Sequence, residues 1–224
     1  MKLKADSEKP KSKNNLINQI YMKTENVILM QQARESLNGK WGLAIGTYLM
    51  LVLISVVLQQ FDQLGTLFIL LITGPLSLGA AIFSLAISRD KEPKFEQLFQ
   101  GFQKFEVAFL AYILMVIFIL LWTLLLIIPG IIAAFSYSMT FYILADDKSI
   151  KAIAALDKSK KMMDGFKMKY FFLSLRFLAW ALLCVLTLGI GFLWLIPYMQ
   201  VTIAKFYADV KANFKEEESM HFEN

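Results

Sequence analysis

The sequence predicts an all-α polytopic membrane protein with six transmembrane helices. It further predicts that these helices form three repeated hairpins and that both termini are cytoplasmic. Three observations lead to this fold class. The chain is 57% hydrophobic, well above the roughly 45 to 50% apolar content of a soluble domain. The apolar residues form four long blocks, and the lysines and arginines lie almost entirely between them.

The four apolar blocks set the number of crossings. They cover residues 41–58, 66–87, 107–144 and 171–204. About 20 residues of helix cross a hydrocarbon core of roughly 30 Å. The third block would form a helix of about 57 Å, and the fourth is nearly as long, so each is predicted to cross twice. Six crossings follow.

The basic residues set the orientation. Of the 23 lysines and arginines, only Arg176 lies inside an apolar block, and the others lie in the two tails and in alternate connections. Basic loops stay in the cytoplasm, so both ends of the chain are predicted there. The predicted organisation is an N-terminal cytoplasmic tail with an amphipathic segment (residues 1–31), a six-helix membrane domain (32–210) and a C-terminal cytoplasmic tail (211–224).

Three segments begin alike and suggest one unit used three times. Each has a glycine, then basic residues, then an aromatic residue that opens an apolar run: NGKWGLAI, GFQKFEVAFL and GFKMKYFFL. Each unit later reaches a proline, Pro75, Pro129 or Pro197. We therefore predict that each unit is a cytoplasmic amphipathic segment followed by a helical hairpin.

The pair Pro129-Gly130 is either a kink inside a membrane helix or the outer turn of a hairpin. Aligning the repeats places the outer turn near Trp122-Thr123 and makes Pro129 a kink about a turn and a half into the fourth crossing. A turn at Pro129-Gly130 would leave the fourth crossing short for a core of roughly 30 Å. The kink is therefore the favoured reading.

The three prolines are all predicted to kink helices. A helical proline leaves the carbonyl four residues earlier without its donor. A threefold arrangement would place the three freed carbonyls, those of Leu71, Leu125 and Leu193, at similar depth. They would then either form a polar site, as in transporters with broken helices, or simply bend the helices for packing.

Amphipathic stretches separate the crossings. The residues from Phe95 to Phe105 place their aromatic and leucine side chains on one helical face, which predicts a helix in the membrane interface. Residues 149–166 are a weaker version. Their Lys151, Lys158, Lys160 and Lys161 are available to lipid phosphates, so anionic headgroups are the predicted partner. The sequence carries no nucleic-acid-binding motif.

Arg176 has two interpretations. An ionisable residue inside a membrane segment is a candidate functional residue. Its side chain can extend back to the cytoplasmic headgroups, which is the favoured interpretation. Alternatively it pairs with Asp209, Asp146 or Glu106, and so locks the bundle or holds a lipid phosphate.

The sequence predicts no catalytic, cofactor-binding or metal-binding residue. It lacks the zinc-protease, nucleophile-elbow and phosphate-loop motifs. The single histidine, His221, lies in the C-terminal tail, and the single cysteine, Cys184, lies in an apolar block. These features favour a protein that is not an enzyme and needs no cofactor.

Small residues one turn apart mark contact faces. Gly42 and Gly46 form such a pair on the first crossing, and Ser77 and Ala81 form one on the second. These faces predict close packing within the bundle, or association with a membrane partner or a second copy. The polar residues best placed for a hydrophilic path are on the sixth crossing but do not share one face: Tyr198, Gln200, Thr202 and Tyr207.

The chain also resembles a known family. The strings LWTLLLIIPGIIAAFSYSMTFYILADD, TLGIGFLWLIPY and KFYADV, together with the opening ARESLNGKWGLAI, are similar to the integral membrane family called domain of unknown function 975. The resemblance implies a six-helix, multi-pass protein of the bacterial cytoplasmic membrane, mostly from Gram-positive bacteria, with no established activity. Arg176 departs from the small or apolar residue that is usual at this place in the family.

Three functions fit these features. The favoured one is a non-enzymatic membrane protein that interacts with lipid and with a membrane partner. The second is a small transporter or exporter component with a site at the kinked helices. The third is a protein that protects the cell from a membrane-active peptide.

Overall fold

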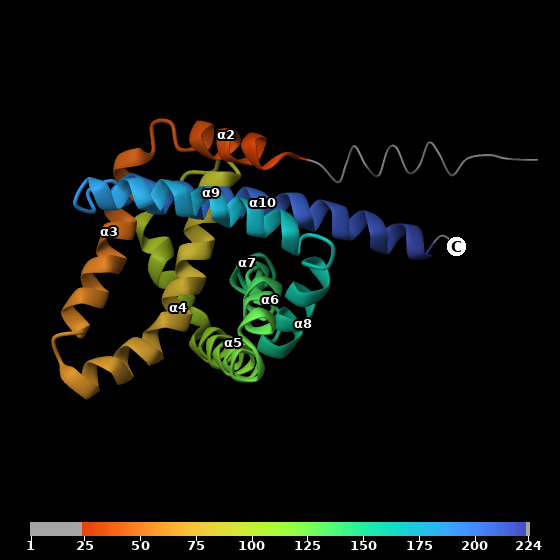
Figure 1. The fold of residues 1–224 in the computed structure, drawn as a ribbon, viewed down its shortest axis with the longest axis horizontal. Coiled ribbons are helices and arrows are strands. Elements are labelled where there is room, and N and C mark those ends of the chain that lie inside the picture. Colours follow the sequence, from red (N-terminus) through yellow and green to blue (C-terminus); the bar gives the residue numbers. More distant parts are fainter. Residues whose placement is uncertain (1–23, 223–224) are drawn as a thin grey trace, which may run out of the picture.

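The computed structural model describes residues 24–222, and this part of the chain is built of helices and short connections (Figure 1). η1 is a 3₁₀-helix, and the others are α-helices. In chain order the elements are α2 (Asn26–Ser36), α3 (Trp41–Leu58), α4 (Asp62–Ser88), η1 (Phe95–Lys104), α5 (Phe105–Leu125), α6 (Ile127–Tyr137), α7 (Thr140–Asp146), α8 (Ala152–Met162), α9 (Lys167–Leu186) and α10 (Phe192–Phe222).

Within the described residues, five helical stretches are long and apolar enough to cross a membrane. They are Trp41–Leu58, Gln63–Ser88, Phe95–Leu125, Ile127–Asp146 and Lys167–Leu186. The predicted sixth crossing corresponds to the start of α10, which is not among the five. α10 continues without a break to Phe222, so the boundary predicted at residue 210 does not coincide with a helix end.

The predicted N-terminal tail lies mostly outside the described residues, and so does most of its predicted amphipathic segment. The first described helix, α2, starts inside that tail and runs past its predicted end at residue 31.

The third apolar block turns at a place that the sequence did not predict. α5 continues through Trp122-Thr123 to Leu125, a single extended residue, Leu126, follows, and α6 starts at Ile127. The predicted turn near Trp122-Thr123 is therefore wrong, and so is the kink at Pro129. Pro129 is the third residue of α6, where a backbone N–H would have no intrahelical acceptor, so proline costs no hydrogen bond there. Pro75 and Pro197 lie inside α4 and α10, as predicted.

A glycine follows each hairpin turn. A Cβ atom on Gly65, Gly130 or Gly191 would overlap Leu58, Thr123 or Cys184, in each case the residue seven positions earlier. These glycines therefore let the two helices of each hairpin meet closely beside the turn.

Gly65, Gly130 and Gly191, which we call the tip glycines, are reference points from which the position of each proline along its helix can be compared. Pro75 lies ten residues after its tip glycine, Pro129 lies one residue before, and Pro197 lies six after. At the helical rise, these positions spread over roughly 16 Å. The freed carbonyls of Leu71, Leu125 and Leu193 therefore do not share one depth, contrary to the prediction.

The three glycines that open the similar sequence segments have different roles. Gly39 and Gly165 adopt positive φ angles of 74° and 76° after α2 and α8, a conformation that glycine adopts without steric cost. Gly101 instead lies against α4, where a Cβ atom would come within 1.9 Å of the Pro75 carbonyl oxygen. η1 therefore packs along the middle of α4.

The tightly packed core lies where the short helices meet the ends of the long ones. Ile143, Leu144, Phe206 and Val210 are almost fully buried there. The hairpins point away from this base in different directions: in Figure 1, α3 and α4 run downward, α9 and α10 run across the top, and α5 is seen nearly end-on. The tips of the second and third hairpins are apolar and open, with Leu124 87% and Leu188 94% exposed, whereas the first tip carries the polar residues Gln59 and Gln60.

Candidate functional site

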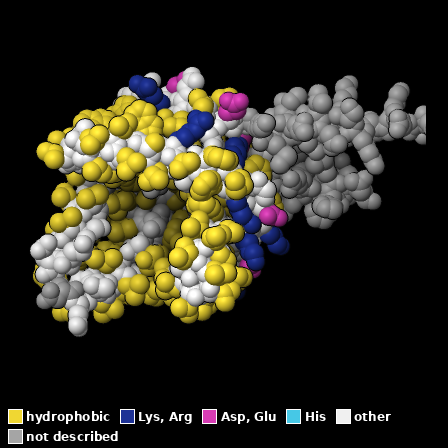
Figure 2. Space-filling model, in the orientation of Figure 1, with side chains coloured by type: hydrophobic (Ala, Val, Ile, Leu, Met, Phe, Trp, Pro, Cys, Tyr) yellow, Lys and Arg dark blue, Asp and Glu magenta, His cyan; other side chains and the backbone are white. Residues whose placement is uncertain are grey.

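A cavity of about 480 Å³ lies between the splayed hairpins. Figure 2 shows the molecule hollowed between the α3–α4 and α5–α6 hairpins, below α9 and α10. Eight of the lining residues are polar but uncharged: Tyr48, Ser55, Thr73, Ser77, Ser138, Tyr142, Tyr170 and Gln200. The other eight are apolar: Leu51, Val52, Leu76, Ala80, Ala81, Phe141, Ile196 and Ile203.

Tyr48 joins α3 to α4 at one side of this cavity. Its hydroxyl lies 2.6 Å from the hydroxyl oxygen of Ser84, which itself donates to the Ala80 carbonyl oxygen at 2.6 Å. The Tyr48 hydroxyl also lies 3.4 Å from the Ala80 carbonyl oxygen, so both hydroxyls meet at this carbonyl group of α4. The small residues Ala80 and Ser84 give the tyrosine ring room to approach α4.

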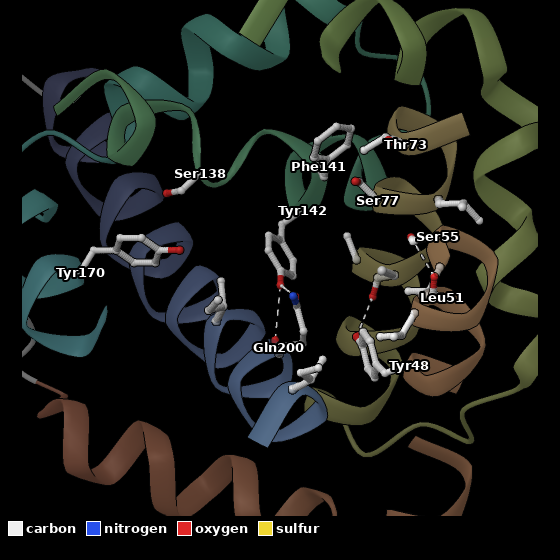
Figure 3. A pocket seen from close by; sticks show the side chains of 16 residues that line it. Tyr48, Leu51, Ser55, Thr73, Ser77, Ser138, Phe141, Tyr142, Tyr170 and Gln200 are labelled. Carbon is white, nitrogen blue, oxygen red and sulfur yellow. Dashed lines mark hydrogen bonds between the residues drawn. The ribbon is translucent and has the colours of Figure 1, made fainter. Parts of the chain in front are cut away.

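Tyr142 joins α7 to α10 at the base of the cavity (Figure 3). Its hydroxyl donates to the side-chain oxygen of Gln200 at 3.2 Å or to the Gln200 carbonyl oxygen at 3.3 Å. The Tyr142 ring stacks on Tyr207, with the ring centroids 5.7 Å apart. Gln200 was predicted as possible material for a hydrophilic path, and it lines this cavity.

An interruption between α6 and α7 forms part of the cavity wall at Ser138. The freed backbone groups are satisfied by Ser159 of α8, whose hydroxyl donates to the Ser136 carbonyl at 2.8 Å and accepts from the Met139 N–H at 3.2 Å. Because Ser159 is fully buried, these bonds hold the interruption in place without water.

A charged clamp joins the ends of the three hairpins. We use this name for Arg89, Asp146, Tyr207 and Lys211. The Asp146 carboxylate accepts from Arg89 at 2.6 Å, from the Tyr207 hydroxyl at 3.0 Å, and from Lys211. The hydrogen bond to Asp146 raises the pKa of Arg89, while burial and the neighbouring carboxylate raise the pKa of Tyr207. Arg89 from the first hairpin end and Tyr207 and Lys211 from the third therefore meet at the Asp146 carboxylate of the second.

A second ion pair joins α9 to α10. Asp209 accepts from Lys169 at 2.6 Å and from Thr24 at 2.6 Å. The ammonium group of Lys169 also lies over the Phe166 and Phe206 rings. Asp209 is thus in an ion pair, but with Lys169 and not with Arg176.

Arg176 lies on the exposed side of α9 and makes no ion pair with any side chain that the structure describes between residues 24 and 214. Three alternative partners were proposed from the sequence. Asp209 and Asp146 are paired with other cations, and Glu106 forms no ion pair with Arg176. Its extension toward headgroups stays a prediction.

The four predicted lipid-facing lysines lie on or next to α8. Lys151 precedes the helix, and Lys158, Lys160 and Lys161 are within it. Lys158 is half-buried and the other three are exposed. Figure 2 shows lysine and arginine side chains gathered at the upper and right edges of the molecule and hydrophobic side chains over the hairpins.

Lys160 also borders a groove of about 300 Å³ between α8 and the second hairpin. Lys167 lies at the same end, and Trp122, Pro129 and Ile132 continue the groove along α5 and α6. The groove thus joins two cations to an apolar channel. The sequence did not predict this arrangement, because it depends on how α8 folds back against α5.

Among the described residues no group of three or more histidine, cysteine, aspartate or glutamate side chains could hold a metal ion. Cys184 is buried against the tip glycine Gly191.

Comparison with known proteins gives one match. A family model described as "Protein of unknown function (DUF975)" matches residues 22–134 and 123–214. The comparison with curated proteins found no match, and the comparison with solved structures found none.

Proposed function

Because the chain belongs to the DUF975 family of proteins of unknown function, we propose its role from its own structure: it is a non-enzymatic, multi-pass membrane protein that interacts with anionic lipids. In this proposal six crossings form three hairpins in the bacterial cytoplasmic membrane, and the short helices and both termini lie on the cytoplasmic side.

The three tip glycines support the repeated hairpins. Each repeat would consist of a short helix (α2, η1 or α8), a first long helix and a returning helix, with the glycine just after the turn. The third repeat would use the apolar start of α10 as the sixth crossing. The basic residues favour the cytoplasmic side for the short helices, since none lies between α3 and α4, between α5 and α6, or between α9 and α10.

The groove beside α8 is the observation that carries the lipid proposal. An anionic lipid has a phosphate that Lys160 and Lys167 can neutralise and an acyl chain that the apolar channel along Trp122 and Ile132 can cover. Lys167 also pairs with Asp164 at 3.4 Å, but this is a weak surface contact that leaves the lysine accessible. Lys151, Lys158 and Lys161 add positive charge on the same helix or just before it. The groove therefore fits both parts of one amphipathic molecule.

A thermal unfolding experiment tests this function. The purified full chain in neutral detergent is titrated with dioleoylphosphatidylglycerol or dioleoylphosphatidylcholine. We expect the anionic lipid to raise the unfolding temperature more, because a ligand that binds only the folded state stabilises it. The double variant Lys160→Gln, Lys167→Gln should lose at least half of that gain.

The matched control is Lys91→Gln with Lys148→Gln, which removes the same charge at two exposed positions that do not line the groove. The proposal fails if both double variants respond alike, or if the zwitterionic lipid stabilises the protein as much as the anionic one.

The central cavity favours a second candidate function, that of a small transporter. A polar cavity between helices is the usual form of a transport site. This candidate predicts that Tyr142→Phe slows the flux of a solute, and it loses support if the variant leaves all measured flux unchanged. Association with a membrane partner or a second copy also stays a proposal. It is supported by Gly42 and Gly46 on α3, where an added Cβ atom would meet open space.

A further inference from the structure

We propose that the central cavity binds a neutral lipid of the diacylglycerol class, with its hydroxyl and ester groups at Tyr142, Gln200 and Ser77 and its acyl chains leaving between the hairpins. This inference rests on the membrane-spanning arrangement proposed above, but not on the lysines of α8.

The lining favours a ligand without charge. All sixteen lining residues are uncharged, and half of them carry a hydroxyl or amide group. A charged headgroup inside a membrane protein needs an opposite charge close by. The nearest clamp cations, Arg89 and Lys211, are already paired with Asp146. The Tyr142 and Tyr207 rings stack at the base of the cavity, and Tyr207 is bonded to that same carboxylate.

The hydrogen-bonding groups left over match hydroxyl and ester groups. Tyr142 donates its proton to Gln200, and Tyr48 is hydrogen-bonded to Ser84 and Ala80, so each hydroxyl oxygen keeps a lone pair that can accept. Among the described residues, Ser77 and the Gln200 amide nitrogen have no hydrogen-bond partner. The cavity thus offers two donors for ester carbonyls and two acceptors for a free hydroxyl.

The arrangement of these groups gives the ligand a direction. Figure 3 shows the Tyr170 hydroxyl directed into the space between the hairpins, the Tyr142 hydroxyl directed toward Gln200, and Ser77 on the α4 side. The apolar lining residues Leu51, Val52 and Leu76 form the wall on the α3 and α4 side. A volume of about 480 Å³ is within the range of small-molecule sites, which is enough for the glycerol group and the start of the chains. The remainder of each chain would lie against the open hairpin tips.

Photolabelling in vesicles tests this proposal. The full chain is placed in phosphatidylcholine vesicles with a trace of a photoactivatable dioleoylglycerol that carries its diazirine near the glycerol. The labelled peptides are then mapped by mass spectrometry. We expect labels on the cavity-lining parts of α4, α7 and α10. Tyr142→Phe and Gln200→Leu should each reduce this labelling about five-fold, since each removes one hydrogen-bonding group.

The controls separate a binding site from general contact with lipid. Tyr112→Phe on α5 makes the same chemical change outside the cavity lining and should leave the labelling unchanged. Ser77→Phe fills the cavity and should abolish it. Because that variant could fail to fold, the unfolding temperature is measured for every variant, and the two nearly isosteric changes at Tyr142 and Gln200 decide the result.

Two outcomes overturn the proposal. One is labelling that stays off the cavity residues or does not respond to Tyr142→Phe and Gln200→Leu. The other is equal cavity labelling by a photoactivatable phosphatidylglycerol, which would make the ligand anionic. Lys160→Gln with Lys167→Gln should reduce phosphatidylglycerol labelling at α8 and leave dioleoylglycerol labelling unchanged. The phosphatidylglycerol labelling thus tests the proposed anionic-lipid function, and the dioleoylglycerol labelling tests this inference, so one can fail without the other.

Discussion

At the scale of single residues, Asp146 connects the three hairpins. It stands at the end of α7 and accepts from Arg89 after α4 and from Tyr207 and Lys211 on α10. The Asp146 side chain is 11% exposed, whereas those of Arg89 and Lys211 are about one third exposed. Water therefore screens the cations in part, but the carboxylate depends on its protein partners.

We predict that Asp146→Asn lowers the free energy of unfolding by about 1 to 3 kcal/mol, because it leaves Arg89 and Lys211 without their counter-charge. The measurement is thermal unfolding of the purified protein in detergent. Asp164→Asn is the control, since its pair with Lys167 is a surface contact in which the Asp164 side chain is 83% exposed. Equal unfolding temperatures for the two variants would show that the charged clamp does not hold the hairpins.

The sequence predicted the individual charges of this region better than their pairing. It placed Asp209 in a possible ion pair and Asp146 among the candidate partners of Arg176. However, the actual cations are Lys169, Arg89 and Lys211. The choice depends on which helix ends meet at the base, and no spacing within the chain carries that information. Arg89 directly follows a predicted membrane helix. A basic residue is expected at such a place in any case, as a cytoplasmic flanking residue, so nothing in the sequence marks Arg89 as an ion-pair partner.

At the scale of helices, the hairpin tips depend on close approach at a glycine. In the second hairpin a Cβ atom on Gly130 would lie 2.1 Å from the Thr123 hydroxyl oxygen and 2.8 Å from its Cα atom. The backbone of α5 itself blocks any side chain there, so α6 can start directly after Leu126 only with glycine at this position.

We predict that Gly130→Ala separates α5 from α6 at the tip and lowers the unfolding free energy by about 1 to 3 kcal/mol. Gly46→Ala on α3 is the matched control. An added Cβ atom there meets open space, and alanine favours the helix, so its effect should be a gain of up to about 1 kcal/mol. Thermal unfolding in detergent compares the two. Equal effects would contradict the role given to the tip glycine.

The sequence predicted the helices well and the second turn poorly, for a physical reason. The first turn is visible as the polar string QQFDQLG, and the third as TLGIG, because both interrupt the apolar run. Around Leu126 the chain reads LLLII, with the same hydrophobicity on both sides of the turn. The proline and glycine that follow are signals of the start of α6, but they were interpreted as an interruption within a helix.

The cavity was the least predictable feature of the site. Tyr48, Tyr142 and Gln200 are far apart in the sequence and occur in runs whose periodicity indicates only membrane helices. They meet because the hairpins converge at the base and diverge toward the tips. The one signal in the sequence was a polar side chain within an otherwise apolar crossing. It identified Gln200 as a candidate residue, but it did not identify Tyr142 as its hydrogen-bond partner.

At the scale of the whole molecule, packing changes from one end to the other. The base is closely packed, whereas large apolar side chains are exposed along the hairpins and at the tips of the second and third ones. Only 17% of the Trp41–Leu58 and Lys167–Leu186 stretches is buried within the protein. In water such surfaces would drive aggregation, whereas lipid chains cover them without cost. The molecule is therefore suited to a bilayer that surrounds the hairpins, with the charged clamp and the short helices at one edge of it.

Cysteine labelling of sealed cells tests this arrangement most directly. In a Cys184→Ser background, single cysteines replace Gln60 and Leu188 at two hairpin tips and Lys158 on α8. A maleimide that cannot cross membranes is added before or after permeabilisation. We predict that the two tip cysteines react in intact cells and that the α8 cysteine reacts only after permeabilisation. Reaction of the Lys158→Cys protein in intact cells, or protection of both tips, would contradict three hairpins crossing from a cytoplasmic base.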